Sequence, residues 1–204
     1  MSDDPQDNDP LFDGDDEANT PLAPEERDGL IPSYITLRRE LNEAEQVNID
    51  KGDRWAFNPR ARHDVLTEDF IRALHKRMYG DVWRWAGDFR TTARNIGVDA
   101  WKIAPDLRVM LDDVKFWIDH RTYPPDEIAI RFHHRLVAIH PFPNGNGRCS
   151  RLVADLLAQK LGQPRFSWGS ANLVAIAETR RAYVAALQTA DRGDIGPLMA
   201  FARS

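Results

Sequence analysis

The 204-residue chain has a single cysteine, Cys149, and no long apolar segment. One cysteine excludes an internal disulfide and a zinc site built on cysteine pairs. No apolar run approaches the roughly 18 to 20 residues that a membrane-spanning helix needs, and the acidic N-terminus lacks the apolar core of a secretory signal. These absences predict a cytoplasmic protein that does not associate with a membrane.

Basic residues are scarce at the N-terminus. Residues 1–30 contain one basic residue, Arg27, against eleven acidic ones, whereas the remainder of the chain has 26 basic and 21 acidic residues. An acidic opening with prolines and few apolar residues is typical of disorder, so we predict an acidic tail at 1–29 and one domain at 30–204. The modest positive charge of the remainder suits an anionic ligand but is too small to indicate nucleic acid.

Apolar residues recur at helical spacing over most of this domain, which predicts a mainly α fold. Thr67 is a candidate N-cap for a helix that ends near Gly80. Residues 81–104 combine aromatic and β-branched side chains with turn formers, which predicts a short β-hairpin or an extended flap. Further helices are expected at about 36–47, 105–118, 126–139, 148–161 and 170–188.

The segment between the helices predicted at 126–139 and 148–161 is rich in glycine, and arginines follow it directly. Gly145 and Gly147 allow the backbone to approach a ligand closely, so that successive N–H groups can converge on an anion. The following helix directs its N-terminus at the same place. Arg148 and Arg151 lie three residues apart on that helix and can bind phosphate oxygens. The segment therefore predicts a phosphate site.

Polar side chains beside this turn add the means for catalysis. His140 stands at its start, and a neutral imidazole can accept a proton from an attacking hydroxyl. Asn144 offers a side-chain oxygen that can help to hold Mg²⁺ beside the phosphates. Phe142 is the expected buried anchor of the loop. For His140 and the two arginines, capping and loop anchoring is the competing interpretation.

The run His140-Pro-Phe-Pro-Asn-Gly-Asn-Gly-Arg-Cys-Ser-Arg151 resembles the active-site motif of Fic-domain proteins, His-Pro-Phe-x-(Asp/Glu)-Gly-Asn-Gly-Arg-x-x-Arg. Asn144 is the one departure. Trp85-Ala-Gly-Asp-Phe-Arg90 also looks like the start of the flap in that family, and the resemblance extends over roughly residues 35–190. The segments Gly29-Leu-Ile-Pro-Ser and Glu40-Leu-Asn-Glu look like the subgroup called mobile mystery protein B. The fold that this implies is a Fic-type helical bundle with a small β-hairpin flap.

The resemblance implies a protein adenylyltransferase, which transfers AMP from ATP to a Ser, Thr or Tyr hydroxyl of a target protein. His140 would deprotonate the hydroxyl. Gly145, Asn146 and Gly147 would cradle the phosphates, and Asn146 would also hold the loop. Arg148 would bind the β- and γ-phosphates and Arg151 the γ-phosphate. The flap, about Thr92–Lys102, would pair with an extended segment of the target.

Asn144 leaves other functions open, because the family usually has a carboxylate there as the Mg²⁺ ligand. Doc-like relatives accept asparagine at this place but act as kinases and have lysine at the position of Gly147. Gly147 and Arg148 therefore favour adenylyl transfer over phosphoryl transfer. The alternatives are another phosphotransferase, removal of AMP, or a degenerate Fic domain that binds nucleotide and regulates, including a toxin held by an antitoxin partner.

A regulatory helix is also expected. Many Fic proteins carry a helix with the pattern Ser/Thr-x-x-x-Glu-(Gly/Asn), whose glutamate pairs with the second arginine of the motif. Thr36 and Glu40 fit the first part of that pattern, and Leu41 departs from it. A Glu40–Arg151 ion pair would occupy the γ-phosphate site, although threonine and glutamate four apart also occur on many solvated helices.

The other residues with reactive side chains fit structural roles better. His75, His133 and His134 lack the spacing of a metal site. Cys149 has no base placed beside it, so a passive helix residue is expected. Trp101 in the flap is expected to be buried rather than to contact a partner.

Overall fold

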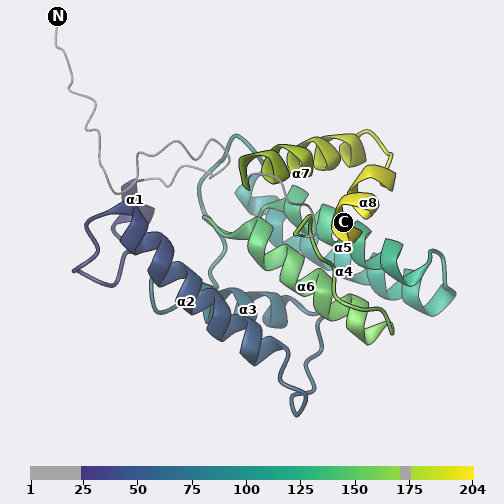
Figure 1. Cartoon of the computed structure of the whole chain (residues 1–204), viewed down its shortest axis with the longest axis horizontal. Helices are drawn as coiled ribbons and strands as arrows, with labels where there is room; N and C mark the ends of the chain where they lie inside the picture. Colours follow the sequence, from purple (N-terminus) through teal and green to yellow (C-terminus); the bar gives the residue numbers. More distant parts are fainter. Residues whose placement is uncertain (1–23, 171–175) are drawn as a thin grey trace, which may run out of the picture.

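The computed structural model describes residues 24–170 and 176–204. Figure 1 shows a helical bundle in which α2 and α3 lie on one side of α6, and α7 and α8 lie on the other. The predicted mainly α class is confirmed. The helices are α1 (Pro24–Arg27), α2 (Arg38–Ala56), α3 (Glu68–Tyr79), α4 (Ile103–His120), α5 (Pro125–Ile139), α6 (Asn146–Lys160), α7 (Ile176–Asp191) and α8 (Gly196–Arg203), with a 3₁₀ turn, η1 (Ala100–Lys102), before α4.

Helix α3 shows how the core forms. The Thr67 side chain accepts a hydrogen bond from the Phe70 N–H at 3.2 Å, which confirms the predicted N-cap. Phe70, Ile71, Leu74 and Met78 share the buried face of the helix. Truncation of a side chain such as the fully buried Leu74 to alanine costs roughly 2–5 kcal/mol of folding free energy. This helix is therefore a rigid support for what packs on it.

Helix α2 is longer than the predicted 36–47. No proline interrupts it, and its one glycine lies where the helix packs closely against α3. Gly52 faces α3, where an added Cβ would lie 2.6 Å from the Met78 Cγ. A small residue here lets the two helices approach each other. The buried positions of α2 are Leu41, Glu45, Asn48, Gly52 and Ala56, which recur every three or four residues.

Helices α5 and α6 pack together and are joined by residues 140–145. Pro125 begins α5, and proline suits the first turn of a helix because its fixed φ is helical and the missing N–H has no partner there. Helix α6 begins at Asn146, two residues earlier than expected, so Asn146 and Gly147 belong to its first turn. The glycine-rich turn and the helix N-terminus are thus continuous.

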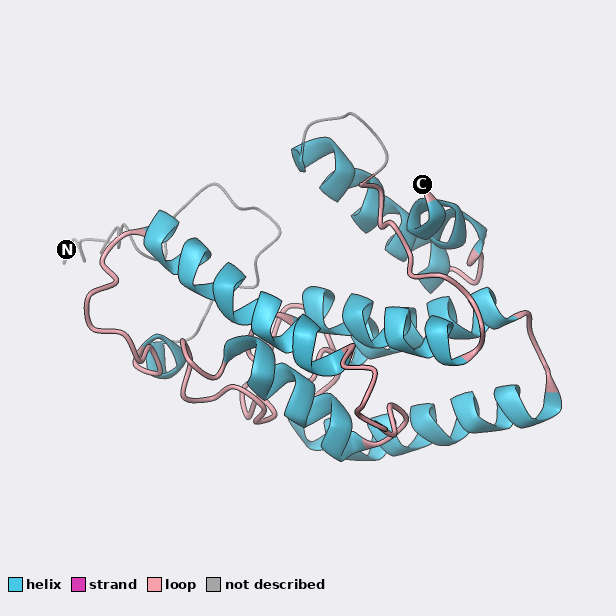
Figure 2. Ribbon diagram, turned by 60° about the horizontal axis from the view of Figure 1, so that its bottom comes forward, coloured by secondary structure: helices cyan, strands magenta, loops and turns pink. Residues whose placement is uncertain are grey.

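The predicted β-hairpin is the one part of the fold that does not form. Figure 2 shows helices and loops only, and among the described residues the sole β pairing is an isolated bridge between Leu30 and Trp83. Residues 88–99, which we call the flap segment, form a coil with several bends and no strand. Their carbonyls bind the Arg90 guanidinium instead of a partner strand. Side-chain bonds have replaced a ladder here, which periodicity cannot foresee.

The two ends of the chain add smaller elements. Residues 24–27, assigned to the acidic tail, form the turn α1, and Gly29 packs against Trp85; residues 1–23 lie outside the described part. The helix expected at about 170–188 is α7, whose described part begins at Ile176 after the undescribed residues 171–175, and α8 follows unpredicted. In the described residues, no helix combines the length and apolarity needed to cross a membrane.

Candidate active site

His140 ends α5 in an unusual backbone conformation. Its φ and ψ are 54° and 61°, in the left-handed region that residues other than glycine rarely adopt. Its N–H still donates to the Leu136 carbonyl at 3.2 Å, and Pro141 follows directly. The chain therefore turns sharply away from the helix axis, and the His140 side chain is 6% exposed at the turn.

Arg90 holds this conformation from the flap side. Its Nε donates to the His140 carbonyl at 2.6 Å, and its own N–H donates to the Pro141 carbonyl at 2.9 Å. The same guanidinium donates to the flap carbonyls of Thr92 and Val98. One buried side chain thus joins the flap segment to the end of α5.

The surroundings keep His140 neutral. Burial, followed by the nearby positive charge of Arg90, lowers the pKa of His140 to about 4. At pH 7 the imidazole is therefore unprotonated and able to accept a proton. On the flap side Gly97, with φ of +93°, lies so close that an added Cβ would be 2.6 Å from the His140 Cβ.

Asn146 closes the loop after His140. Its Oδ1 accepts from the Phe142 N–H at 2.9 Å, and its Nδ2 donates to the Phe142 carbonyl at 2.8 Å. Gly145 adopts a φ of +77° against the Tyr79 ring, where a Cβ would lie 2.5 Å from a ring carbon. A larger residue at Gly145 would therefore be strained by its backbone and by its neighbour.

The N-terminus of α6 presents its first amides at this loop. Gly145 is the N-cap and supplies no side-chain acceptor. The N–H of Cys149 donates to the Gly145 carbonyl, so the amides of Asn146, Gly147 and Arg148 precede the first intrahelical bond. Such amides, with the positive end of the helix dipole, favour an anion. The phosphate cradle stays a prediction, and these amides are the groups that would form it.

The two arginines of α6 reach different elements. Arg148 donates to the Glu45 Oε2 of α2 at 3.1 Å, and its guanidinium lies 5.5 Å from the centre of the Tyr79 ring of α3. Arg151 lies 5.3 Å from the centre of the Tyr183 ring of α7. The two guanidinium groups therefore lie on different sides of the first turns of α6, Arg148 toward α2 and α3 and Arg151 toward α7.

Comparisons with known proteins agree with this arrangement. The family model described as Fic/DOC family matches residues 65–158. Protein adenylyltransferase fic-1 of Caenorhabditis elegans is 32% identical over 144 residues, which are 68% of this chain and 27% of that protein. Protein adenylyltransferase Fic of Drosophila grimshawi is 31% identical over 190 residues, 91% of this chain and 38% of that protein. This chain belongs to the Fic/DOC family.

Solved structures give the same Fic fold. The structure of Fic-1 from C. elegans aligns with a TM-score of 0.63 and 26% identity, covering 86% of this chain and 50% of that one. BepC from Bartonella tribocorum aligns with a TM-score of 0.66 and 17% identity, covering 89% of this chain and 97% of that one. The chain spans about a quarter to two fifths of the length of the curated relatives above.

The expected Glu40–Arg151 pair is not the contact that this Fic domain makes. Glu40 is the third residue of α2, and its Oε2 accepts from the N–H groups of Thr36 at 3.0 Å and Leu37 at 3.1 Å. These bonds lower the pKa of Glu40. The pattern Thr36-x-x-x-Glu40 is therefore a helix cap, with Glu40 on the solvent side of α2.

Glu45 is the acidic residue that α2 brings to the motif. Its Oε2 accepts from Arg148 at 3.1 Å, and its Oε1 accepts from the Trp83 indole N–H at 2.8 Å. Glu45 is 6% exposed, and a buried carboxylate needs such partners. Its spacing of four from the apolar Leu41 was a signal in the sequence that Glu45 lies on the inner face.

His75 supports the loop from α3. The residue is fully buried, and its ring stacks on Phe142 with the ring centres 3.7 Å apart. Nε2 bonds to the Asn144 carbonyl and Nδ1 to the Gly87 N–H, each at 3.0 Å. Burial lowers its pKa to about 3, so it is neutral. The structural role expected for His75 is correct, and the residue packs against residues 140–147, which we call the active loop.

His133 of α5 and Cys149 of α6 are also buried. His133 of α5 bonds through Nε2 to the Tyr183 hydroxyl at 3.0 Å, and burial lowers its pKa to about 3. Burial raises the pKa of Cys149 to about 12, so its thiol is not a nucleophile at neutral pH. The passive role predicted for Cys149 fits this environment.

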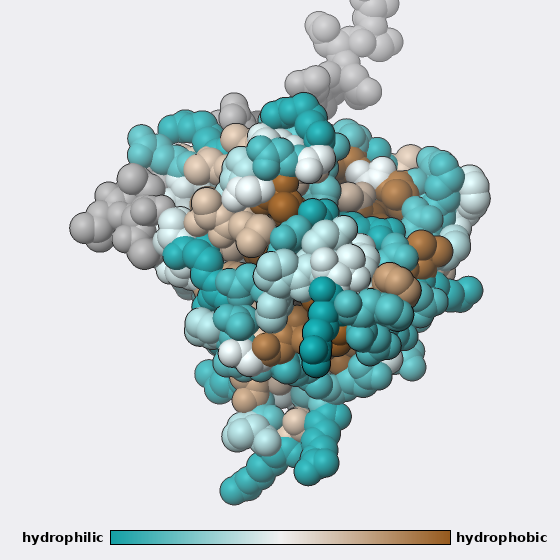
Figure 3. Space-filling view, turned by 90° about the vertical axis from the view of Figure 1, so that its right-hand side faces the viewer, coloured by the Kyte–Doolittle hydropathy of each residue, from teal (hydrophilic) through white to brown (hydrophobic). Residues whose placement is uncertain are grey.

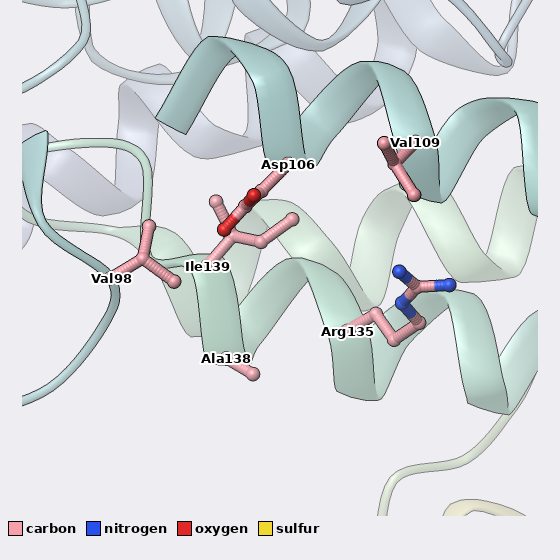
Figure 4. Close-up of a pocket in the computed structure, with 6 residues that line it drawn as sticks. All are labelled: Val98, Asp106, Val109, Arg135, Ala138 and Ile139. Atoms are coloured by element: carbon pink, nitrogen blue, oxygen red, sulfur yellow. The ribbon is translucent and has the colours of Figure 1, made fainter. Parts of the chain in front are cut away.

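The flap differs from expectation at its outer surface. Trp101 is 74% exposed, so the predicted burial is wrong. Figure 3 shows the apolar side chains of one face of the molecule as separate patches among polar ones. A hollow of about 280 Å³ lies where α4 and α5 meet the flap (Figure 4), and it is lined by Val98, Asp106, Val109, Arg135, Ala138 and Ile139.

Proposed function

We propose that this Fic domain transfers AMP from ATP to a hydroxyl of a target protein. The observation that carries the proposal is the juxtaposition of a neutral histidine, His140, with the N-terminal amides of α6 that precede its first intrahelical bond. A base and an anion site at one turn are what nucleotidyl transfer requires. The resemblance of the chain to protein adenylyltransferases supports the same chemistry.

The reaction follows from these roles. The target hydroxyl oxygen forms a bond to the α-phosphorus of ATP as its proton passes to His140. The bond from the α-phosphorus to the bridging oxygen breaks, and pyrophosphate leaves. The expected cradle was Gly145, Asn146 and Gly147, but the Gly145 N–H donates to the Asn144 Oδ1. The amides of Asn146, Gly147 and Arg148 therefore receive the phosphate charge, and Arg148 and Arg151 bind the terminal phosphates. Phosphoryl transfer by the same cradle is the second candidate function, because the Doc-like kinases of this family accept asparagine at the position of Asn144.

Mg²⁺ would be held largely by the nucleotide. No group of three histidine, cysteine or acidic side chains suited to a metal occurs among the residues described. The Asn144 Oδ1, which accepts from the Gly145 N–H at 2.6 Å, is the oxygen at the loop that can join the phosphates as a ligand. Mg²⁺ commonly has few protein ligands and completes its coordination with phosphate oxygens and water, which one ligand from Asn144 would match. When bound, the ion would neutralise phosphate charge.

The target would dock on the flap, about Thr92–Lys102. The N–H groups of Asn95 and Ile96 donate to no backbone carbonyl within the described ranges. Ile96 and Trp101 are largely exposed. A segment whose backbone amides have no backbone acceptor and whose apolar side chains are exposed can accept a strand from another protein. The antitoxin partner, the cytoplasmic location and the mobile mystery protein B subgroup remain predictions from the sequence.

The same proposal includes a brake in α2, with Glu45 in place of Glu40. Its ion pair with Arg148 engages a guanidinium that the terminal phosphates of ATP would otherwise bind. Because Glu45 also accepts from the Trp83 indole N–H, its carboxylate is held beside Arg148 by a second bond that must break when it moves away. Autoinhibition by the N-terminal helix is thus retained, with a different acid and the first arginine.

The decisive experiment compares label from the two ends of ATP. The purified chain and its Glu45→Gln variant are incubated with a lysate and either α-labelled or γ-labelled ATP. We expect protein labelling from the α-phosphate only, increased in the variant and absent in His140→Ala. Labelling from the γ-phosphate alone would identify a kinase. Nucleotide binding with no labelling from either position, in both proteins, would identify a regulator.

A further inference from the structure

His75 occupies the junction of three segments that are distant in the sequence. It lies on α3, its Nδ1 is 3.0 Å from the Gly87 nitrogen, and its Nε2 is 3.0 Å from the Asn144 carbonyl oxygen. The ring is stacked on Phe142 at an interplanar angle of 15°. Gly87 precedes the flap segment, whereas Phe142 and Asn144 belong to the active loop.

The two contacts determine which nitrogen carries the proton. A backbone N–H only donates, so Nδ1 must present its lone pair to Gly87. A backbone carbonyl only accepts, so Nε2 must donate its proton to Asn144. The imidazole is therefore the neutral tautomer protonated at Nε2, with both nitrogens used. This tautomer satisfies both buried backbone groups, while the other neutral tautomer satisfies neither.

The backbone groups that His75 binds are at bends. Asn144 precedes Gly145, whose φ of +77° sets the direction of the chain into α6. Gly87 has a φ of +88°, and the chain that follows it leads to Arg90, which binds the His140 carbonyl. The chain from Gly87 to Arg90, which leads into the flap segment, is therefore attached to residues 140–147 at two places, through His75 at Gly87 and through the Arg90 guanidinium.

We propose that His75 is a positioning residue, which fixes the Asn144 carbonyl and thereby the direction of the first amides of α6 toward the nucleotide. The inference rests on the proposed function for what the cradle binds. A histidine that served only as core packing would need its ring and not its two nitrogens. The role assigned here needs a donor and an acceptor at these two atoms.

Two substitutions separate these roles. His75→Phe keeps an aromatic ring to stack on Phe142 and removes both hydrogen bonds, whereas His75→Gln loses the ring and keeps one donor and one acceptor. A lost bond to a buried backbone group costs about 1–3 kcal/mol, or roughly 5- to 150-fold in an equilibrium. We expect His75→Phe to weaken ATP binding by about tenfold or more, and His75→Gln to retain affinity within a few fold of the unmodified chain.

A matched variant controls for stability. Leu74 is the fully buried neighbour of His75 on α3, and Leu74→Val removes packing without altering any hydrogen bond at the loop. ATP affinity is measured for all variants in the Glu45→Gln background, at temperatures where each is folded. If Leu74→Val at equal stability loses as much affinity as His75→Phe, or if His75→Gln is the weaker binder of the pair, the positioning role is refuted.

A measurement on the unmodified chain keeps the inference testable if His75→Phe does not fold. A ¹H–¹⁵N spectrum of the histidine rings should show His75 protonated at Nε2, with Nδ1 as an unprotonated acceptor. Protonation at Nδ1 would overturn the proposal. Because this spectrum and the ATP affinities do not depend on AMP transfer, the inference can fail or stand separately from the proposed activity.

Discussion

The active loop and the flap segment lie against each other but are built in different ways. Residues 140–147 are mostly buried, and the loop is closed by the reciprocal bonds of Asn146 with Phe142. Residues 88–99 are held mainly by Arg90 and carry Ile96 at the surface. A closed network that satisfies its polar groups is rigid. The loop therefore suits invariant chemistry, and the flap suits an exchangeable partner.

Removal of the base from the loop should have the largest effect. His140→Ala is expected to lower AMP transfer by about 10² to 10⁴-fold, the usual contribution of a general base, and to leave ATP binding within a few fold. Rates with α-labelled ATP and affinities by calorimetry measure the two. Equal losses in rate and affinity would show that His140 shapes the site and is not the base.

Release of the loop from α2 should have the next largest effect, with opposite sign. Glu45→Gln is expected to raise AMP transfer by roughly 5- to 150-fold, as for a coupling of 1–3 kcal/mol, because Arg148 loses its ion pair. Glu40→Gln is the control, since that residue caps α2 away from the loop. An increase in the control that equals the first would return the regulatory role to Glu40.

Acid should lower the free energy of unfolding, because three buried neutral histidines become protonated when the chain unfolds. His75, His133 and His140 have pKa values of about 3, 3 and 4, below the ordinary 6.5. Between pH 6.5 and about 4 the unfolded chain binds more protons than the folded one, so the free energy of unfolding decreases as the pH is lowered. The slope approaches about 1.4 kcal/mol per pH unit for each histidine. Urea unfolding at several pH values tests this, and AMP transfer should stay active to about pH 5. A flat stability profile would mean that these rings are solvated.

The flap surface should tolerate change in the folded state. Trp101→Ala is expected to alter unfolding free energy by less than about 0.5 kcal/mol, since the side chain is 74% exposed. Its effect should appear only in the rate toward a target protein, with ATP affinity unchanged. A thermal melt and an ATP titration give both quantities. A loss of several degrees in Tm would show that the flap needs this tryptophan for its own packing.

Local signals in the chain were enough for the main elements. Thr67 caps α3 as expected because capping involves residues three apart in one segment. The cradle at Gly145 and the following helix was predictable for the same reason: its amides, glycine and arginines lie within twelve consecutive residues. The hairpin was not, since alternation cannot distinguish a strand from a coil whose carbonyls are bound by a side chain such as Arg90.

By itself, then, the amino-acid sequence determined that this chain is mainly helical and carries the Fic motif at 140–151, and it led to the proposal that this turn binds phosphate. Only the tertiary structure decided that Glu45 rather than Glu40 reaches Arg148, and that His75 binds Asn144. The physical reason is sequence distance: the Arg148–Glu45 bond joins residues 103 positions apart, and the His75–Asn144 bond joins residues 69 apart. Which side chains meet over such spans depends on how helices pack, and packing is decided by the whole core at once.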